Sequence, residues 1–155
     1  MRKITIVAVG RLKERHWREA AEEYRKRLAP YAAVEVVEVA DRDVTRDEVR
    51  ALAEEGADVA RALPEGARVF VLDVGGRERT SEEFAAHLAE LALDGHSHAV
   101  FVIGGAAGLA EEVVARAHER LSLGRMTLPH QLARVVLLEQ LYRAFRIQRG
   151  EPYHR

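Results

Sequence analysis

Hydrophobic residues recur along the chain in two alternating patterns, short apolar runs and longer stretches with helical spacing. The runs predict five strands, at residues 3–9, 34–39, 68–73, 99–103 and 123–128. Between them, apolar residues three or four positions apart predict helices; the first set is Trp17, Ala20, Ala21, Tyr24 and Leu28. A last helix is expected over about 131–147, and Gly150 and Pro152 should end it.

Two Thr-x-x-Glu sequences mark expected helix starts. Thr45 precedes Glu48 and Thr80 precedes Glu83 at the same spacing. In a capping box the threonine hydroxyl accepts a hydrogen bond from the glutamate N–H, and the glutamate carboxylate accepts one from the threonine N–H. We therefore predict helices that begin just after Thr45 and Thr80.

Strands that alternate with helices predict an α/β fold, a mostly parallel sheet of five to six strands with helices on both faces. No linker or repeat interrupts residues 1–155, so a single domain is expected. Ligands of parallel sheets bind beyond the carboxyl ends of the strands. The segments after Asp73, Ile103 and Leu128 are therefore the expected site.

Composition removes several kinds of chemistry. The chain contains no cysteine, which excludes disulfides, thiolate catalysis and thiolate metal sites. Its histidines show no metal-ligand spacing with carboxylates, so no metal is expected. No apolar run approaches the roughly 18 residues of a membrane span, and no signal-peptide cleavage pattern follows the first residues. We expect a cytoplasmic protein that is not bound to a membrane.

Charge is unevenly distributed. The formal net charge is −1, which by itself argues against a nucleic-acid partner. However, residues 1–120 contain 18 basic and 23 acidic residues, whereas residues 121–155 contain 6 basic and 2 acidic ones. The basic last quarter of the chain favours a polyanionic partner such as RNA.

Two segments after predicted strands carry candidate ligand-binding residues. Gly104, Gly105 and Gly108 form a glycine-rich turn where backbone can approach a ligand closely. The turn has neither the dinucleotide-binding glycine spacing nor the Lys of a phosphate-binding loop, so an ordinary strand-to-helix turn fits equally well. His130, after Pro129, is a candidate general base or phosphate ligand, or only a polar residue at a helix start.

The end of the chain combines three functional side chains. Tyr153, His154 and Arg155 offer base stacking, proton exchange and a phosphate contact, although a frayed terminus fits the position as well. Arg143 and Arg146 share one stripe on the polar side of the last helix. The tail and the loop after Leu128 flank this helix, and we expect these basic elements to converge. Arg134 interrupts the wide apolar surface of that helix and needs either a partner or an escape to solvent near the helix start. The width of this surface predicts a subunit interface.

One family has these features together. Residues 7–13 (VAVGRLK), the Gly104-Gly105-x-x-Gly108 turn, and residues 128–135 (LPHQLARV) continuing through EQLYRA to the terminal PYHR resemble the ribosomal RNA large subunit methyltransferase H family, of the SPOUT class. The resemblance covers the whole chain. It implies S-adenosyl-L-methionine-dependent methylation of N3 of a pseudouridine in a 23S rRNA stem-loop, in the assembled ribosome, by a homodimer. It also implies a SPOUT-type C-terminal trefoil knot, a topology that general folding rules disfavour.

The resemblance also assigns residues. It implies that the cofactor site comprises Leu72, Gly104, Leu123, Gly124, Arg125, Met126, Thr127 and Leu128. The family often has a proline and an acidic residue in its glycine turn, where this chain has Ala106 and Ala107. The catalytic group would be Tyr153, His154, Arg155 and Arg143. In this interpretation the tyrosine orients the base, the histidine handles the N3 proton and the arginines hold phosphates.

Two other functions remain open from the residues alone. A different nucleotide-binding α/β enzyme would share the strand pattern but lacks a standard phosphate loop. A non-catalytic ribosome-binding or RNA-binding module would explain the basic end of the chain without explaining the glycine turn.

Overall fold

The computed structural model describes residues 1–43 and 45–153. Its strands are β1 (Lys3–Val9), β2 (Ala33–Val39), β3 (Arg68–Glu78), β4 (His98–Ile103) and β5 (Glu119–Ser122). Its helices are α1 (Arg15–Leu28), α2 (Glu48–Ala62), α3 (Ser81–Leu93), α4 (Glu111–Arg116) and α5 (His130–Gln148). Among the helices of these residues, none is long and apolar enough to cross a membrane.

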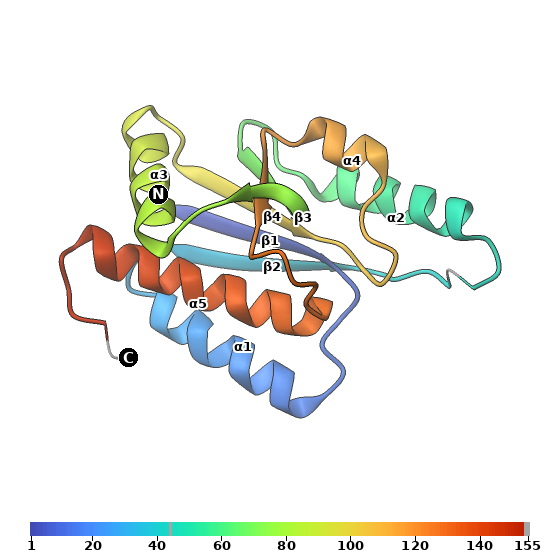
Figure 1. Ribbon diagram of the computed structural model, residues 1–155, viewed down its shortest axis with the longest axis horizontal. Coiled ribbons are helices and arrows are strands. Elements are labelled where there is room, and N and C mark those ends of the chain that lie inside the picture. Colours follow the sequence, from blue (N-terminus) through green and yellow to red (C-terminus); the bar gives the residue numbers. More distant parts are fainter. Residues whose placement is uncertain (44, 154–155) are drawn as a thin grey trace.

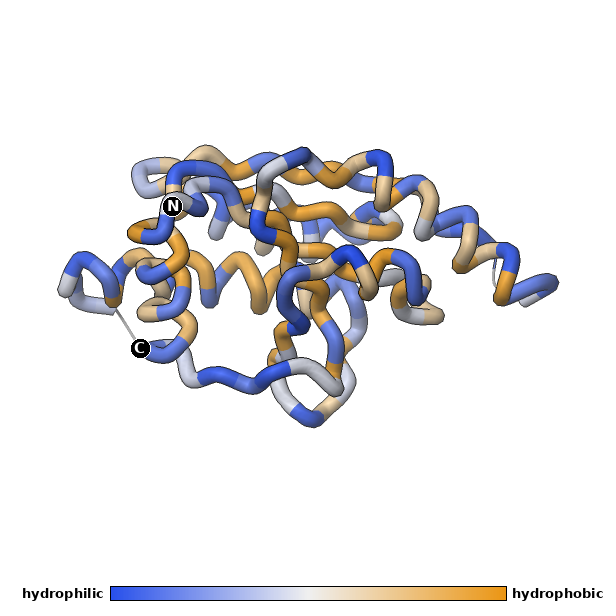
Figure 2. Tube along the Cα trace, turned by 90° about the horizontal axis from the view of Figure 1, so that it is seen from above, coloured by the Kyte–Doolittle hydropathy of each residue, from blue (hydrophilic) through white to orange (hydrophobic). Residues whose placement is uncertain are grey.

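The strands form one parallel sheet in the order β2-β1-β4-β3-β5, as expected for an α/β fold. Alternate residues of β1 face opposite sides: Ile4 and Ile6 pack with α1, α3 and α5, whereas Val7 and Val9 pack with α2 and α4. Figure 1 shows these helices on the two faces of the sheet. In Figure 2 hydrophobic positions recur along the strands, whereas many hydrophilic positions lie in the outer turns.

The fifth strand differs from its prediction. It comprises Glu119–Ser122, and residues 123–128 form a loop. Gly124 has a φ of +140°, a conformation that side-chain-bearing residues rarely adopt. The Ser122 hydroxyl accepts a hydrogen bond from the Gly124 N–H and donates one to the Gly124 carbonyl. The apolar residues of 123–128 therefore line a cavity instead of extending the sheet.

The two expected helix caps have different outcomes. Thr80 forms a complete capping box with Glu83 at the start of α3. At α2 the prediction is wrong, because Asp47 is the N-cap and accepts from the Arg50 N–H. Thr45 instead donates its hydroxyl to Asp43, 2.6 Å away, in the preceding turn. Either short polar side chain can cap a helix, so spacing alone did not locate the start.

Strands β3 and β5, the last two in the sheet order, approach each other closely. Leu121 of β5 pairs with both Leu72 and Arg77 of β3, so the intervening part of β3 leaves the sheet and returns to it. A Cβ atom at Gly76 would lie 2.7 Å from the Arg120 carbonyl carbon, which shows how closely the two backbones cross there. This crossing directs the end of β3 and the loop after β5 toward the same edge of the sheet.

Candidate cofactor pocket and catalytic tail

A cavity of about 770 Å³ lies at the carboxyl ends of β3, β4 and β5. It is lined by residues 72–74, the 103–109 turn, the loop after β5 and the start of α5. The expected cofactor residues that line it are Leu72, Gly104, Leu123, Gly124, Met126, Thr127 and Leu128. Arg125 does not line the cavity and is exposed at the loop tip. The structure thus brings together seven of the eight predicted residues.

The glycine turn has a steric requirement for two of its glycines. A Cβ atom at Gly104 would lie 2.6 Å from the carbonyl oxygen of Gly108, too close for any side chain. Gly108 has a φ of +84° and donates its N–H to the Gly105 carbonyl. The turn is therefore compact, and its backbone forms one wall of the cavity.

Asp73 also lines the cavity, although no motif in the sequence marks it as a site residue. It lies at the end of the regular part of β3, and that position was the available signal. The Gly75 N–H and the Arg120 guanidinium, both bonded to its carboxylate, hold the pKa of Asp73 below its ordinary value. An ionised carboxylate therefore fixes the β3 end at the cavity mouth. His130 also lines the cavity.

The exposed surface of the cavity is partly apolar. Met126 is 85% exposed and Val74 is 50% exposed, although both line the cavity. Such side chains at a rim are available to cover a flat apolar ligand such as a purine ring. Among residues 1–43 and 45–153, no three His, Cys, Asp or Glu side chains are grouped to hold a metal ion.

The C-terminal tail folds back onto α5. The Tyr153 hydroxyl donates to Glu139, and the Arg143 guanidinium lies 3.7 Å from the Tyr153 ring centre. Arg143 also forms an ion pair with Glu139, at 2.6 Å. Burial and the neighbouring Glu139 carboxylate raise the pKa of Tyr153 to about 12. His154 and Arg155 lie outside the described residues.

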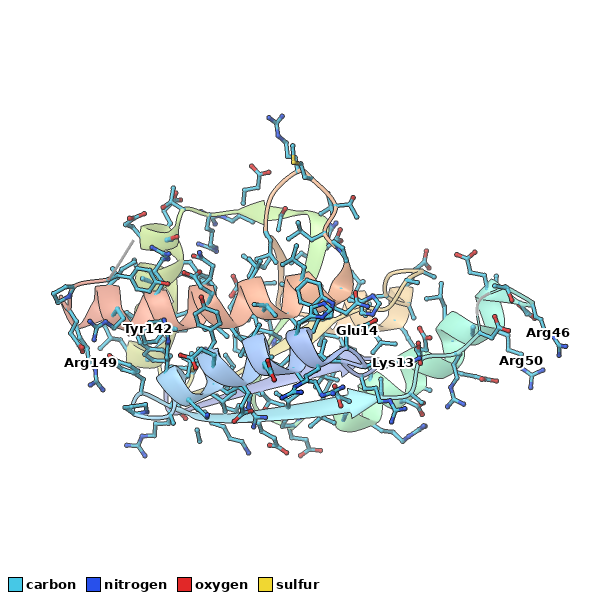
Figure 3. The ribbon with its side chains drawn as sticks, turned by 90° about the horizontal axis from the view of Figure 1, so that it is seen from below. Lys13, Glu14, Arg46, Arg50, Tyr142 and Arg149 are labelled. Carbon is cyan, nitrogen blue, oxygen red and sulfur yellow. The ribbon has the colours of Figure 1, made fainter. Side chains whose placement is uncertain are left out.

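The tail belongs to a surface rich in tyrosine and arginine. Tyr142 lies 5.7 Å from Tyr153 and 6.1 Å from Tyr31, measured between ring centres. Arg27 and Arg149 stack on this group, over Tyr142 and Tyr31 respectively. Figure 3 shows Tyr142 and Arg149 toward the same end of α5. Tyrosine and arginine are enriched in recognition surfaces of proteins.

The tail and the cavity occupy different parts of α5. The cavity reaches His130 and Ala133, whereas the tail contacts Glu139 and Arg143. With a rise of 1.5 Å per residue, Glu139 lies about 14 Å and Arg143 about 20 Å along the helix from His130. The expected convergence therefore holds for Arg143 and Tyr153, but the loop after β5 is not part of it.

Arg134 is buried, and its partners lie on two strands. Its Nη1 donates to Glu38 of β2 at 2.6 Å, and its Nη2 donates to the Gly10 carbonyl after β1 at 3.0 Å. The side chain is thus fully accommodated within one chain. It fastens the start of α5 to the carboxyl ends of β1 and β2.

Comparison with known proteins places the chain among methyltransferases. Residues 2–154 match the family model described as "Predicted SPOUT methyltransferase". A protein of Listeria monocytogenes serotype 4b (strain CLIP80459), named ribosomal RNA large subunit methyltransferase H, is 51% identical; the alignment covers 98% of this chain and 99% of the relative. A relative of the same name from Carboxydothermus hydrogenoformans is 49% identical with the same coverage.

A solved structure supports the fold alone. The probable methylase family protein from Haemophilus influenzae Rd KW20 superimposes with a TM-score of 0.57 at 13% identity, over 99% of this chain and 70% of the other. The likeness extends over the whole sheet and its covering helices.

Proposed function

Because the chain belongs to the SPOUT methyltransferases, and within them to the ribosomal RNA large subunit methyltransferase H family, we propose that it methylates N3 of a pseudouridine in 23S rRNA. The methyl donor is S-adenosylmethionine, the substrate is a stem-loop of the assembled large subunit, and the active form is a cytoplasmic homodimer. The trefoil knot of the SPOUT class comes with the family. The observation that supports this function best is one cavity at the strand ends, in a chain about half identical to such enzymes over its full length.

The cavity residues suit the proposed cofactor. Leu72, Met126 and Leu128 provide apolar surface for an adenine ring, and the backbone of the 104–108 turn provides hydrogen-bonding groups at its edge. When bound, S-adenosylmethionine supplies an electrophilic methyl group on a sulfonium. A volume of about 770 Å³ falls within the usual range for small-molecule sites.

The methyl transfer requires a proton acceptor and accurate placement of the pseudouridine. A bond forms between N3 of the pseudouridine and the methyl carbon, the carbon–sulfur bond breaks, and the N3 proton leaves. We assign acceptance of that proton to His154, orientation of the base to Tyr153, and phosphate contacts to Arg143 and Arg155. Positioning should supply much of the rate.

The distance between tail and cavity supports a site shared between subunits. Tyr153 contacts Glu139 and Arg143, which lie about 9 Å and 15 Å along α5 from Ala133, where the cavity of its own chain reaches that helix. In a homodimer, the tail of one subunit would act at the cavity of the other. The tyrosine and arginine surface on α1 and α5 has the composition of a subunit contact.

Two measurements test the proposal. Calorimetry should detect binding of S-adenosylmethionine and none of nucleoside phosphates; the reverse result would favour another nucleotide-binding enzyme. His154→Ala and Arg155→Ala should each lower methylation of ribosomes at least tenfold without weakening cofactor binding. Arg46→Ala serves as the control, because Arg46 is exposed, does not line the cavity and lies at the opposite end of the molecule from Tyr142 (Figure 3). Parental rates in both tail variants would refute the assignment, and a parent protein without any methylation would favour a non-catalytic module.

A further inference from the structure

A second hollow, of about 690 Å³, lies between α1, β2 and α5. It shares no lining residue with the cofactor cavity. Its charged lining side chains are Arg11, Lys13, Arg18, Arg25, Arg134, Glu22 and Glu38. Five cations and two carboxylates give this basic groove an excess of three positive charges, in a chain whose net charge is −1.

Both carboxylates of the basic groove are already paired. Glu38 binds Arg134 at 2.6 Å, and Glu22 lies 3.7 Å from Arg25. Arg11, Lys13 and Arg18 form no ion pair with any carboxylate of residues 1–43 and 45–153. Three cations of the groove therefore remain available to an external anion.

The loop between β1 and α1 is built to present these cations. Leu12 is only 7% exposed and anchors the loop in the core, while its neighbours Arg11 and Lys13 are exposed. Nη1 of Arg18 donates to the carbonyls of Leu12 and Lys13, which fixes the loop backbone. Figure 3 shows Lys13 near the start of α1.

The groove and the cofactor cavity lie on two sides of the same helical turn. Ala133 lines the cavity, and the next residue, Arg134, lines the groove. A helix with its side chains is about 10 Å across, so a few nucleotides of RNA can span the two sites. Arginine suits phosphate because its planar fork of donors matches two phosphate oxygens.

From this arrangement we infer that the basic groove binds a backbone phosphate of the RNA strand that carries the target base. The inference rests on the proposed function, since it takes rRNA as the substrate. Arg11, Lys13 and the remaining donors of Arg18 contact the phosphate, while Arg134 with Glu38 forms the fixed floor of the groove. The contact sets the position of the strand relative to the methyl donor.

The test compares two double variants of the full chain. Arg11→Ala with Lys13→Ala removes two charges from the groove, and Arg15→Ala with Lys26→Ala removes two from α1 outside its lining. Binding to unmethylated ribosomes is measured by cosedimentation over a range of salt concentrations. We expect the groove variant to bind at least tenfold more weakly and to lose about 1 to 2 from the slope of log K against log salt. The control should keep the parental slope.

The other outcomes are distinguishable. Equal slopes for the groove variant and the control would overturn the inference. A change in sedimentation of the free protein, with an unchanged slope, would show that the groove is a contact between copies of the chain, and would overturn it too. Because binding is measured without turnover, an inactive parent would refute the proposed function while the slopes still decide the groove.

Discussion

The guanidinium of Arg143 lies 3.7 Å from the centre of the Tyr153 ring, and both side chains bind the carboxylate of Glu139. A cation over an aromatic face and a shared carboxylate hold the tail in a defined place on α5. Arg143 therefore positions the tail, in addition to any phosphate contact that it makes.

Tyr153 should ionise late. Its pKa is raised to about 12, first by burial and then by Glu139, so the protonated phenol is favoured in the folded chain. The stabilisation that it contributes is complete below the ordinary value of about 10 and is lost as pH rises through about 12. Alkaline absorbance titrations of the parent and Tyr153→Phe should coincide up to about pH 11 and separate near 12. Separation centred at pH 10 would contradict the contact with Glu139.

Gly104→Ala should weaken cofactor binding. Its Cβ would lie 2.6 Å from the Gly108 carbonyl, so the turn that walls the cavity must shift. We expect calorimetry to show at least a tenfold weaker affinity for S-adenosylmethionine. Gly95→Ala strains the backbone at a φ of +94° in the turn before β4, outside the cavity lining, and therefore controls for a general loss of stability. Equal affinity in the parent and Gly104→Ala would show that the turn does not form the site.

The helix caps predict a stability contrast between two threonines. Thr80→Ala removes the cap of α3 and should lower the free energy of unfolding by about 1 kcal/mol. Asp47→Ala should have a similar effect at α2, whereas Thr45→Ala, which loses only an exposed turn contact, should change it by less than about 0.5 kcal/mol. Denaturant unfolding measures all three. A larger loss of stability for Thr45→Ala than for Asp47→Ala would support Thr45, and not Asp47, as the N-cap of α2.

Arg134→Met should destabilise the junction of α5 with β1 and β2. The substitution leaves the Gly10 carbonyl and Glu38 without their donor, and we expect a loss of roughly 2 kcal/mol. Glu38→Gln keeps a hydrogen-bond acceptor and should lose less. Thermal unfolding of the two variants compares their losses of stability. A larger loss for Glu38→Gln than for Arg134→Met would contradict the role of Arg134 in holding α5 to β1 and β2.

The sequence predicted the layers better than the loops. Apolar periodicity located β1 and α5 to within a residue or two, because their buried faces are continuous. Residues 123–128 have the same apolar density, yet a left-handed Gly124 and its bonds to Ser122 turn them away from the sheet. Periodicity does not distinguish a buried strand from a loop that lines a cavity.

The sequence predicted only part of the site, because some of its contacts join residues that are far apart in the chain. Strand ends and family motifs pointed to Leu72, Gly104 and the 123–128 loop, all of which meet at one cavity. The pairing of Arg134 with Glu38 joins residues far apart in the chain, and only the sheet order places them together. The sequence did not predict the basic groove either, because its cations come from α1, α5 and the loop after β1 and meet only in the folded chain.

The most direct test of the proposed function is mass spectrometry of 23S rRNA from a strain in which the gene for this chain has been deleted. We predict that one pseudouridine loses a single methyl group, that the intact chain restores it, and that His154→Ala does not. A methylpseudouridine that persists unchanged in the deletion strain would contradict the account.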